Sequence, residues 1–326
     1  MSGALVEVRR LKKYFDVEKG FLESLFSKHK KVVHAVDGIS FSIQTGEAFG
    51  LVGESGSGKT TTGLLVLGLI KPTDGKVFFE GRDIFALKKK ELQRLRQKMQ
   101  VIFQDPTASL DPRMTIKDII SEPLKVHKVP NIADRVQEVM DRVGLTPLST
   151  YLHRHPHELS GGQRQRVGIA RALVLNPKFI VADEPVSMLD LSIQAEILNL
   201  LDDLKRELGL TYLFIAHDLA TVKYLCDRIA VMYLGKIVEL CKCQDLLRPP
   251  KHPYTEALIM AYPTINPKLK IKKGIIPGTE IPSSIDPPSG CRFHTRCPYA
   301  EPKCKKTEPE LISIGKGHWI ACHRFS

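Results

Sequence analysis

A glycine-rich motif between two apolar segments constrains the fold of this 326-residue chain most strongly. Residues 53–61 read Gly-Glu-Ser-Gly-Ser-Gly-Lys-Thr-Thr, directly after the apolar run 48–52 and before the apolar stretch 63–70. This spacing predicts a loop that joins a strand to a helix and turns backbone N–H groups and the helix N-terminus toward phosphate oxygens. The motif therefore predicts a nucleotide-phosphate site formed by Gly53, Glu54, Ser55, Gly56, Ser57, Gly58, Lys59, Thr60 and Thr61.

Lysine, threonine and two later carboxylates have distinct expected roles at this site. Lys59 contacts the β- and γ-phosphates, and the Thr60 hydroxyl is a ligand of Mg²⁺. The apolar residues 179–182 run into Asp183 and Glu184, so both carboxylates lie at the C-terminal end of a buried strand, where parallel α/β sheets bind ligands. We expect Asp183 to hold the Mg²⁺ shell and Glu184 to polarise the water that attacks the γ-phosphate.

Composition and charge limit the class of protein. Hydrophobic residues make up 43% of the chain and charged residues 26%, which is typical of a globular protein. The apolar stretches are shorter than the roughly 20 residues that cross a bilayer, and residues 1–13 lack the apolar core of a secretory signal, so we expect a cytoplasmic location. The net charge of +12 is compatible with nucleic acid, but no aromatic residues interleave with the basic residues 88–90, and no nucleic-acid partner is expected.

A change in composition after residue 247 predicts that the chain has two domains. Short β-type runs predict an antiparallel edge beside a mixed sheet whose core strands are nearly continuous in hydrophobicity, as in an α/β fold. A helical subdomain, about residues 105–175, is inserted into a nucleotide-binding domain of residues 1–247. Prolines break up every long element after it, so residues 248–326 are predicted to form a small loop-rich domain. The predicted edge strands are 6–9, 41–43 and 77–79, and the predicted core strands are 48–52, 100–103, 179–182 and 213–216.

A third motif carries a family resemblance. Leu-Ser-Gly-Gly-Gln at residues 159–163, followed by Arg-Gln-Arg, resembles the signature sequence of ABC-transporter ATPases. Ser160 is expected to cap the following helix, and Gly161 and Gly162 let a phosphate approach its start, with Gln163 beside them. In the resembling family this surface meets the γ-phosphate of ATP held by the other subunit. The resemblance implies a P-loop NTPase fold of the ABC type that hydrolyses ATP with Mg²⁺.

Other positions of the family pattern also match. Gln104 corresponds to the glutamine that senses Mg²⁺ and the attacking water and links the site to the helical subdomain. Asp190 ends a loop that resembles the dimer-contacting loop, although the second residue of that loop is methionine where alanine is more usual. His217 corresponds to the switch histidine that hydrogen-bonds the γ-phosphate. Phe15 corresponds to the aromatic residue that stacks on adenine, with Tyr14 as the alternative.

Four of the seven cysteines gather near the C-terminus, with gaps of five, six and seventeen residues between them. A reducing compartment disfavours disulfides. Zinc usually takes close cysteine pairs, and iron–sulfur clusters accept more varied loops, so the spacing leaves a cluster, zinc and free thiols open. The four residues are Cys291, Cys297, Cys304 and Cys322.

The residues around these cysteines resemble the C-terminal domain of oligopeptide and dipeptide importer ATPases. They read Pro-Ser-Gly-Cys-Arg-Phe-His-Thr-Arg-Cys-Pro at 288–298 and Gly-His-Trp-Ile-Ala-Cys at 317–322, and His-Pro-Tyr-Thr at 252–255 also matches. Some members of that family hold a 4Fe-4S cluster on the four cysteines, so we expect such a cluster here, with Zn²⁺ as the alternative. A structural role is expected, because a metal staple stabilises a proline-rich module, and a redox-regulatory module is the alternative.

The resemblance covers essentially the whole chain and implies the ATP-hydrolysing subunit of a di- or oligopeptide importer. Residues 96–113 and the glutamine after the signature glycines resemble the F-type subunit, which pairs with a distinct D-type ATPase, a homodimer being the second choice. The implied partners also include two transmembrane permeases and a solute-binding protein, which place the chain at the cytoplasmic face of the membrane. A soluble ABC ATPase acting on ribosomes or nucleic acid is the alternative function, and oligosaccharides or nickel chelates are alternative cargoes.

Overall fold

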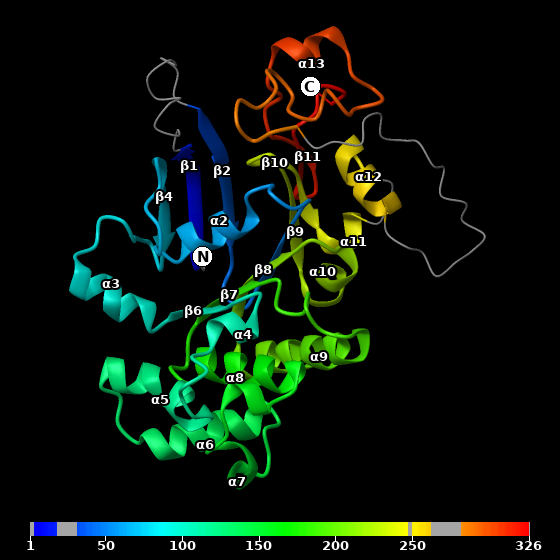
Figure 1. The fold of residues 1–326 in the computed structure, drawn as a ribbon. Helices are drawn as coiled ribbons and strands as arrows, with labels where there is room; N and C mark the ends of the chain where they lie inside the picture. The colour runs from blue at the N-terminus through cyan, green and yellow to red at the C-terminus, as the bar shows by residue number, and fades with distance from the viewer. Residues whose placement is uncertain (1–2, 18–30, 247–249, 262–281, 326) are drawn as a thin grey trace, which may run out of the picture.

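A computed structural model describes residues 3–17, 31–246, 250–261 and 282–325. The domain boundary predicted between residues 247 and 248 lies within a stretch, 247–249, that is outside these ranges. The described residues 250–261 and 282–325 are called the C-terminal module below. Figure 1 shows most of this module at the opposite end of the molecule from a lobe of helices.

Two sheets form the centre of the fold (Figure 1). Their strands are β1 (Val6–Asp16), β2 (Val32–Ile43), β3 (Ala48–Val52), β4 (Asp74–Phe79), β5 (Arg82–Asp83), β6 (Met99–Ile102), β7 (Phe179–Asp183), β8 (Thr211–Ala216), β9 (Arg228–Tyr233), β10 (Lys236–Lys242), β11 (Ile312–Gly315) and β12 (His318–Ile320). An antiparallel sheet has the order β2-β1-β4-β5, and an eight-stranded sheet has the order β11-β12-β10-β9-β3-β8-β7-β6. The five strands from β9 to β6 are parallel, and β10, β12 and β11 extend them in antiparallel fashion.

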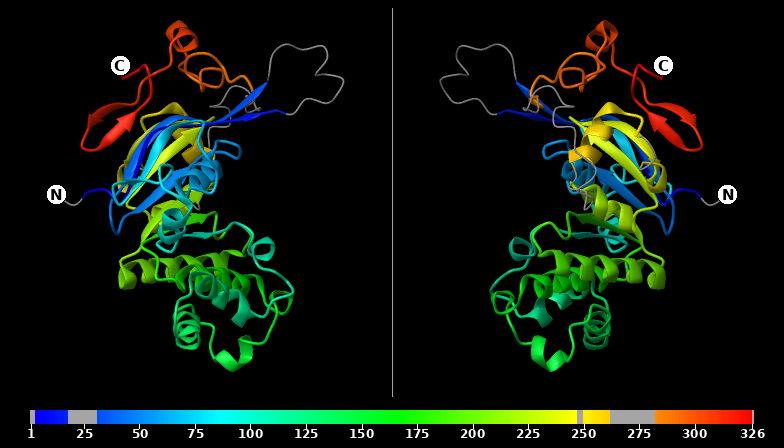
Figure 2. Two further views of the ribbon diagram at one scale, coloured as in Figure 1. Left: turned by 90° about the vertical axis from the view of Figure 1, so that its left-hand side faces the viewer. Right: turned by 90° about the vertical axis from the view of Figure 1, so that its right-hand side faces the viewer.

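Helices cover this sheet and form the separate lobe seen in Figures 1 and 2. They are α2 (Lys59–Val66), α3 (Lys89–Arg96), α4 (Pro106–Ser109), α5 (Ile116–His127), α6 (Ile132–Arg142), α7 (Leu148–Tyr151), the 3₁₀ turn η1 (Pro156–Glu158), α8 (Gly161–Leu173), α9 (Leu191–Leu208), α10 (Leu219–Leu225), α11 (Cys243–Leu246), α12 (Pro253–Ala261) and α13 (Pro302–Lys306). The lobe consists of α4 to α8, and its longest helix, α8, is buried along most of its length. The predicted α/β class, with a mixed sheet, an antiparallel edge and a helical insertion, is confirmed.

Successive side chains along each core strand point to opposite faces of the sheet, so the interior contains two hydrophobic cores, one on each face. On β7, Phe179 and Val181 face the antiparallel sheet and α2, whereas Ile180 and Ala182 face α8, α9 and the lobe. All five residues of β7 are buried, because helices or a second sheet cover both faces. The continuous apolar runs in the sequence therefore correspond to strands without a solvent-facing side.

Two parts of the fold differ from the sequence prediction. Strands β1 and β2 are longer than the predicted segments 6–9 and 41–43. The sequence analysis missed their added length because much of it is polar and because the pairing of the two strands contains several register shifts, which interrupt the alternating pattern. The predicted loop-rich tail also contributes the hairpin β11–β12 to the edge of the large sheet, where Glu239 pairs with Ile320 and Leu240 with Trp319. Strands of three or four residues that pair with distant partners leave little local pattern in a sequence.

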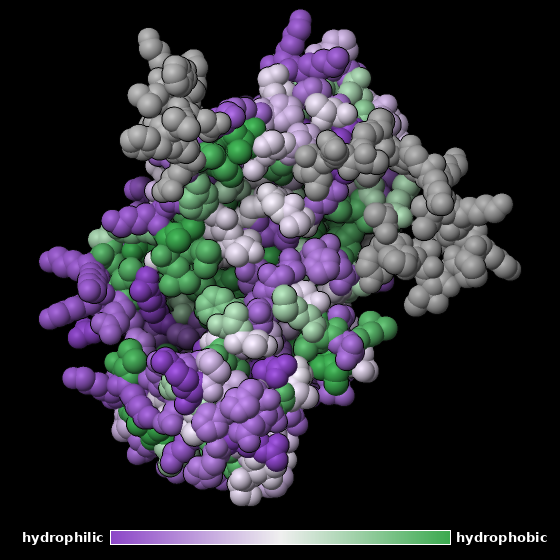
Figure 3. Space-filling model, in the orientation of Figure 1, coloured by the Kyte–Doolittle hydropathy of each residue, from purple (hydrophilic) through white to green (hydrophobic). Residues whose placement is uncertain are grey.

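The described helices include none long and apolar enough to cross a bilayer. Hydrophilic side chains predominate over α3 and the helical lobe on the face drawn in Figure 3. The three cysteines outside the C-terminal cluster, Cys226, Cys241 and Cys243, are buried, as expected for small apolar side chains.

Close packing of β3 against α10 yields a stability prediction. A Cβ atom on Gly50 would overlap the Val222 side chain and come within 3.3 Å of the Cys226 sulfur. We expect Gly50→Ala to reduce the free energy of unfolding by about 1–3 kcal/mol, measured by urea unfolding with circular dichroism. Gly168→Ala on α8 is the matched control, since its Cβ meets nothing within 4 Å and alanine favours a helix by about 1 kcal/mol. Equal stabilities of the two variants would contradict the tight contact.

Candidate nucleotide site

The phosphate loop follows β3 and ends where α2 begins. Gly58 occupies the N-cap position of α2 with a φ of 103°, a conformation that favours glycine. A Cβ atom at this position would overlap the carbonyl oxygen of Ala35 and lie 2.8 Å from Met232 Cε. The backbone thus approaches its neighbours so closely that only glycine fits, which is the geometry that the motif predicts.

Lys59 reaches back over the loop. Its Nζ donates hydrogen bonds to the carbonyl oxygens of Gly53 at 2.8 Å and Glu54 at 3.0 Å. Burial lowers the pKa of Lys59, and the nearby carboxylates of Glu184 and Asp183 oppose this shift. The ammonium group therefore lies at the centre of the loop, where phosphate oxygens would complete its coordination.

Asp183 and Thr60 come together from the ends of β7 and the start of α2. Thr60 Oγ1 donates a hydrogen bond to Asp183 Oδ1 at 3.2 Å. Burial raises the pKa of Asp183, and this hydrogen bond and Lys59 partly offset the rise. A hydroxyl and a carboxylate oxygen are ligands that suit Mg²⁺, and the sequence predicted both.

Glu184 is the meeting point of three predicted residues. Gln104 Nε2 donates to Glu184 Oε2 at 3.0 Å, and His217 Nδ1 lies 3.1 Å from the same oxygen. Glu184 has a φ of 45°, unusual for a residue with a side chain, and its N–H donates to the carbonyl oxygen of Ile215 at 2.9 Å. The hydrogen bond to Ile215, at the end of β8, therefore holds the Glu184 backbone in this strained conformation. In this conformation the carboxylate of Glu184 points toward Gln104 and His217.

The signature motif forms the start of α8. Ser160 Oγ accepts from the N–H of Gln163 at 3.3 Å, and Gln163 Oε1 accepts from the N–H of Ser160 at 3.0 Å, which makes a capping box. A Cβ atom on Gly162 would lie 2.7 Å from the Ile193 side chain, and one on Gly161 would lie 3.4 Å from Leu189. The glycines thus let the motif pack against the beginning of α9.

The predicted dimer-contacting loop lies beside this motif. Asp190 is exposed at the N-cap position of α9, although its side chain makes no cap hydrogen bond. Met188 and Leu191 on either side of it are 61% and 83% exposed. Exposed apolar side chains next to an open helix N-terminus are typical of a surface that a partner covers.

The structure separates the predicted residues into two groups. The phosphate loop, the two carboxylates, Gln104 and His217 form one site. The described contacts of the signature motif and Asp190 are instead with the helical lobe and the start of α9. Figure 1 shows α2 and the lobe that contains α8 in different parts of the molecule. The start of α8 therefore belongs to a surface distinct from the site around Glu184.

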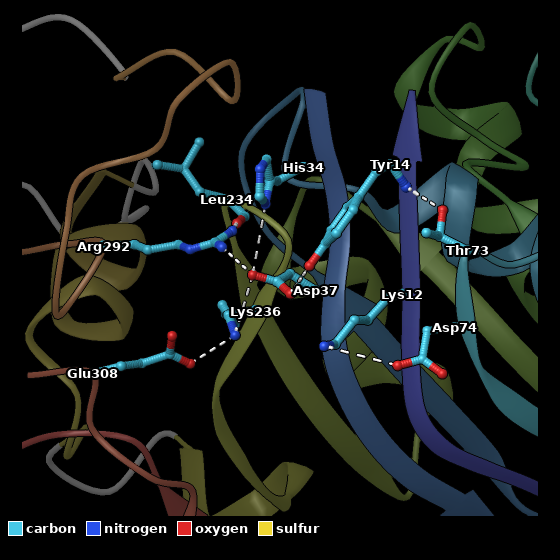
Figure 4. A network of polar contacts seen from close by, with 10 residues as sticks. All are labelled: Lys12, Tyr14, His34, Asp37, Thr73, Asp74, Leu234, Lys236, Arg292 and Glu308. Atoms are coloured by element: carbon cyan, nitrogen blue, oxygen red, sulfur yellow. Dashed lines mark hydrogen bonds and ion pairs between the residues drawn. The ribbon is translucent and has the colours of Figure 1, made fainter. Parts of the chain in front are cut away.

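Of the two candidate adenine-stacking residues, Phe15 has the more accessible ring. Phe15 is 40% exposed, with Lys13 Nζ 4.8 Å from its ring centroid. Tyr14 instead donates its hydroxyl to Asp37 Oδ1 at 2.5 Å, and Arg292 of the C-terminal module pairs with the same carboxylate (Figure 4). Burial and the hydrogen bond raise the pKa of Tyr14, so the hydroxyl stays protonated and bound.

Sequence reasoning missed two residues that contact the phosphate loop. Arg296 binds the carboxylate of Glu54, and the Tyr254 hydroxyl accepts from the N–H of Glu54. Both lie inside motifs that the sequence analysis had singled out in the tail. Their partner lies 200 or more positions earlier, so no local pattern could have assigned them to the loop.

The four late cysteines line one small pocket in the C-terminal module. Burial raises the pKa of the Cys291 thiol to about 11 and also raises the pKa of the Cys297 and Cys322 thiols. Each of these three sulfurs accepts a backbone N–H two residues further on, from Phe293, Tyr299 and Arg324. N–H donors aimed at sulfur favour the thiolate form, which is the form that binds metals.

A second set of side chains in this part of the fold also offers metal-ligand atoms. The ligand atoms of such a group lie within 4.8 Å of one another. Among the described residues, the group that meets the 4.8 Å limit is Glu239, Cys241 and His318. Glu239 there already accepts from His318 Nε2 at 2.8 Å and from the N–H of His252 at 3.1 Å, so this group is a buried hydrogen-bond network.

Together, the mixed sheet, the phosphate loop, the paired carboxylates and the signature helix define an ATP-binding cassette. Residues 36–187 match the family model described as ABC transporter, and residues 238–304 match the model described as oligopeptide/dipeptide transporter, C-terminal region.

Curated relatives match over nearly the whole chain. The oligopeptide transport ATP-binding protein AppF of Bacillus subtilis is 48% identical over 99% of this chain and 98% of its own length. The oligopeptide transport ATP-binding protein OppF of Salmonella typhimurium is 50% identical over 98% of this chain and 95% of its own length. The dimeric, post-hydrolysis structure of the ATP-binding cassette MJ0796 bound to ADP and phosphate is 28% identical, with a TM-score of 0.63 over 73% of this chain and 98% of that chain.

The chain therefore belongs to the ABC transporter ATPases that carry the oligopeptide/dipeptide transporter C-terminal region. The family and the ATPase activity expected from the sequence motifs are confirmed.

The buried carboxylate of Asp183 gives a pH-dependent prediction. Because its pKa is raised in the folded chain, the folded state binds more protons than the unfolded state between the ordinary and the raised pKa, and stability falls as the pH rises through that window. We expect Asp183→Asn, without Mg²⁺ or nucleotide, to melt about 1–3 °C above the wild type at pH 7, with the difference vanishing toward about pH 4. Differential scanning fluorimetry across this pH range measures it.

Asp111→Asn is the control of opposite sign. Hydrogen bonds from Arg113 lower the pKa of Asp111 to about 2, so this carboxylate contributes stability above its ordinary pKa and loses it as the pH falls. Asp111→Asn is therefore expected to melt no higher than the wild type at pH 7. A lower melting temperature for Asp183→Asn at pH 7 would show that attraction to Lys59 outweighs the cost of burial.

Proposed function

We propose that this chain hydrolyses ATP at a seam between two ATP-binding subunits and thereby drives the import of di- or oligopeptides. The names of the relatives AppF and OppF support peptides as the cargo class. The convergence of Gln104 and His217 on one oxygen of Glu184 is the observation that carries the proposed chemistry.

The phosphate loop binds the phosphates of ATP before hydrolysis. Lys59 exchanges its hydrogen bonds to the loop carbonyls for the β- and γ-phosphates, and the loop N–H groups and the start of α2 bind the same anion. Thr60 and Asp183 would hold Mg²⁺, which would supply positive charge to offset the charge that develops on the phosphate oxygens. Phe15 stacks on the adenine base, where its exposed ring offers an apolar face.

Glu184 accepts a proton from the attacking water. Gln104 and His217 hold the carboxylate from two sides, so its free oxygen is directed by a fixed backbone and two hydrogen-bonding side chains. Such positioning supplies much of the rate enhancement in phosphoryl transfer. Gln104 lies where β6 leads into the helical lobe, so it links the state of the nucleotide to that lobe.

A second subunit completes the site. The signature residues Ser160, Gly161, Gly162 and Gln163 lie at the start of α8, in the helical lobe, whereas the phosphate loop leads into α2 in another part of the molecule (Figure 1). Near Asp190, the exposed Met188 and Leu191 offer a surface to a partner. We propose a D-type ATPase subunit as that partner, with two permeases contacting the helical lobe and a solute-binding protein delivering the cargo. This assembly places the chain at the cytoplasmic face of the membrane.

Glu184→Gln tests the catalytic assignment. Glutamine retains the hydrogen-bonding shape but accepts no proton, so we expect turnover to fall at least about a hundredfold while Mg-ATP binding persists. Phosphate release and the binding of a fluorescent ATP analogue measure the two quantities. Glu207→Gln, at a 62% exposed side chain paired with Arg142, is the matched control and should leave both unchanged. Normal turnover in Glu184→Gln would remove this residue from its role.

The same proposal includes a 4Fe-4S cluster on Cys291, Cys297, Cys304 and Cys322. Their shared pocket and the N–H donors to three of the sulfurs support a group held by thiolates, and the varied loop lengths between the cysteines favour a cluster over Zn²⁺. Such a group would hold the short elements of the C-terminal module together.

Anaerobic purification followed by iron, sulfide and zinc analysis tests this assignment. We expect about four iron atoms per chain, with the visible absorption of an iron–sulfur cluster, and loss of both in Cys297→Ser. Cys226→Ser is the control, since that buried cysteine lies outside the pocket. One zinc per chain, or four freely alkylated thiols without metal, would contradict the cluster.

A further inference from the structure

The C-terminal module binds Glu54, a residue of the phosphate loop. Arg296 donates two hydrogen bonds to Glu54, from Nη1 to Oε2 at 2.8 Å and from Nη2 to Oε1 at 3.0 Å. The Arg296 side chain is 7% exposed and that of Glu54 is 25% exposed. A bidentate pair with this degree of burial fixes the orientation of both side chains far more firmly than a surface ion pair does.

A second contact from the module holds the backbone of the same residue. The Tyr254 hydroxyl accepts a hydrogen bond from the N–H of Glu54 at 2.8 Å. Tyr254 is itself immobilised, because its ring is buried and packs 4.6 Å from the Tyr233 ring and 5.4 Å from the Phe293 ring, measured between centroids. Both the side chain and the amide of Glu54 are thus bound by the module.

Glu54 also lies next to the lysine that binds phosphate. The carbonyl oxygen of Glu54 accepts from Lys59 Nζ, and the N–H of Ser57 donates to the same oxygen at 3.2 Å. The orientation of the Glu54 backbone therefore sets the position of a carbonyl oxygen that binds both Lys59 Nζ and the N–H of Ser57. A loop held in its binding geometry before the ligand arrives loses less entropy on binding.

We propose that Arg296 and Tyr254 are positioning residues of the nucleotide site, which hold Glu54 and so make the affinity for Mg-ATP depend on the C-terminal module. This inference rests on the proposed nucleotide site. It assigns to the module a role in nucleotide binding in addition to any role in stability. Neither residue touches the nucleotide in this account, and both act through Glu54.

Equilibrium binding of a fluorescent ATP analogue to the full-length chain tests the proposal, together with steady-state hydrolysis by the assembled transporter. We expect Arg296→Ala to weaken Mg-ATP binding about tenfold and Tyr254→Phe, which keeps the ring, about threefold, in line with the loss of a charged and a neutral hydrogen bond. KM should rise while kcat changes less than twofold, because Glu184, Gln104 and His217 are untouched. Arg296→Lys should restore part of the affinity.

A double-mutant cycle separates positioning from a general effect on folding. If Arg296 acts through Glu54, Arg296→Ala combined with Glu54→Ala should bind no more weakly than Glu54→Ala alone. Glu308→Gln is the matched control, since it removes another ion pair between module and cassette, that of Glu308 with Lys236 at 2.6 Å. Among the described residues, neither member of this pair is hydrogen-bonded to residues 53–61. Its affinity for Mg-ATP should equal that of the wild type.

Three results would overturn the proposal. They are unchanged affinity in folded Arg296→Ala and Tyr254→Phe, additive losses in the cycle, or an equal loss in Glu308→Gln. Should Arg296→Ala fail to fold, Tyr254→Phe decides, because it removes one oxygen and leaves the aromatic packing. Failure of the wild type to bind Mg-ATP would instead refute the underlying nucleotide site, so the two failures are distinguishable.

Discussion

The parallel register of β3, β7 and β8 is the constraint on which the site depends. Val52 pairs with Ala216, and Asp183 pairs with Ile215, so three strands end at one edge of the sheet. The residues that follow them, Gly53, Glu184 and His217, consequently emerge side by side although they are far apart in the sequence. Two hydrophobic cores, one on each face, hold this register, because a slip of one residue would turn every buried side chain to the opposite face.

The same packing imposes an energetic conflict at the site. Lys59 and Asp183 are both buried, and burial shifts the pKa of each toward its neutral form. Glu184 adds a backbone conformation that few residues with side chains adopt. These features lower the stability of the folded chain, and a bound polyanion with its cation relieves them, so binding energy and the stability of the empty site are linked.

The sequence predicts those parts of the fold and site that depend on local pattern. The phosphate loop, the carboxylates at the end of β7 and the signature helix each occupy a continuous stretch with fixed residue types. The structure adds that Gln104 and His217 both contact Glu184, which the sequence motifs did not specify. The hairpin β11–β12 and the contacts of Arg296 and Tyr254 with Glu54 were not predicted, because they join short segments to residues that are far away in the sequence. Pairings of this kind are decided by tertiary packing, which leaves no periodic trace in a single sequence.

The long span between Glu54 and Arg296 has a consequence for the order in which the protein takes shape during synthesis. The phosphate loop is synthesised early, yet Arg296, which binds Glu54, follows 242 residues later, and the last described strand, β12, pairs with β10 later still. A nascent chain in which the cassette motifs have already been synthesised therefore still lacks the Arg296 side chain that binds Glu54 in the phosphate loop. A chain terminated before Arg296 would therefore carry every motif of the cassette without the residue that holds Glu54.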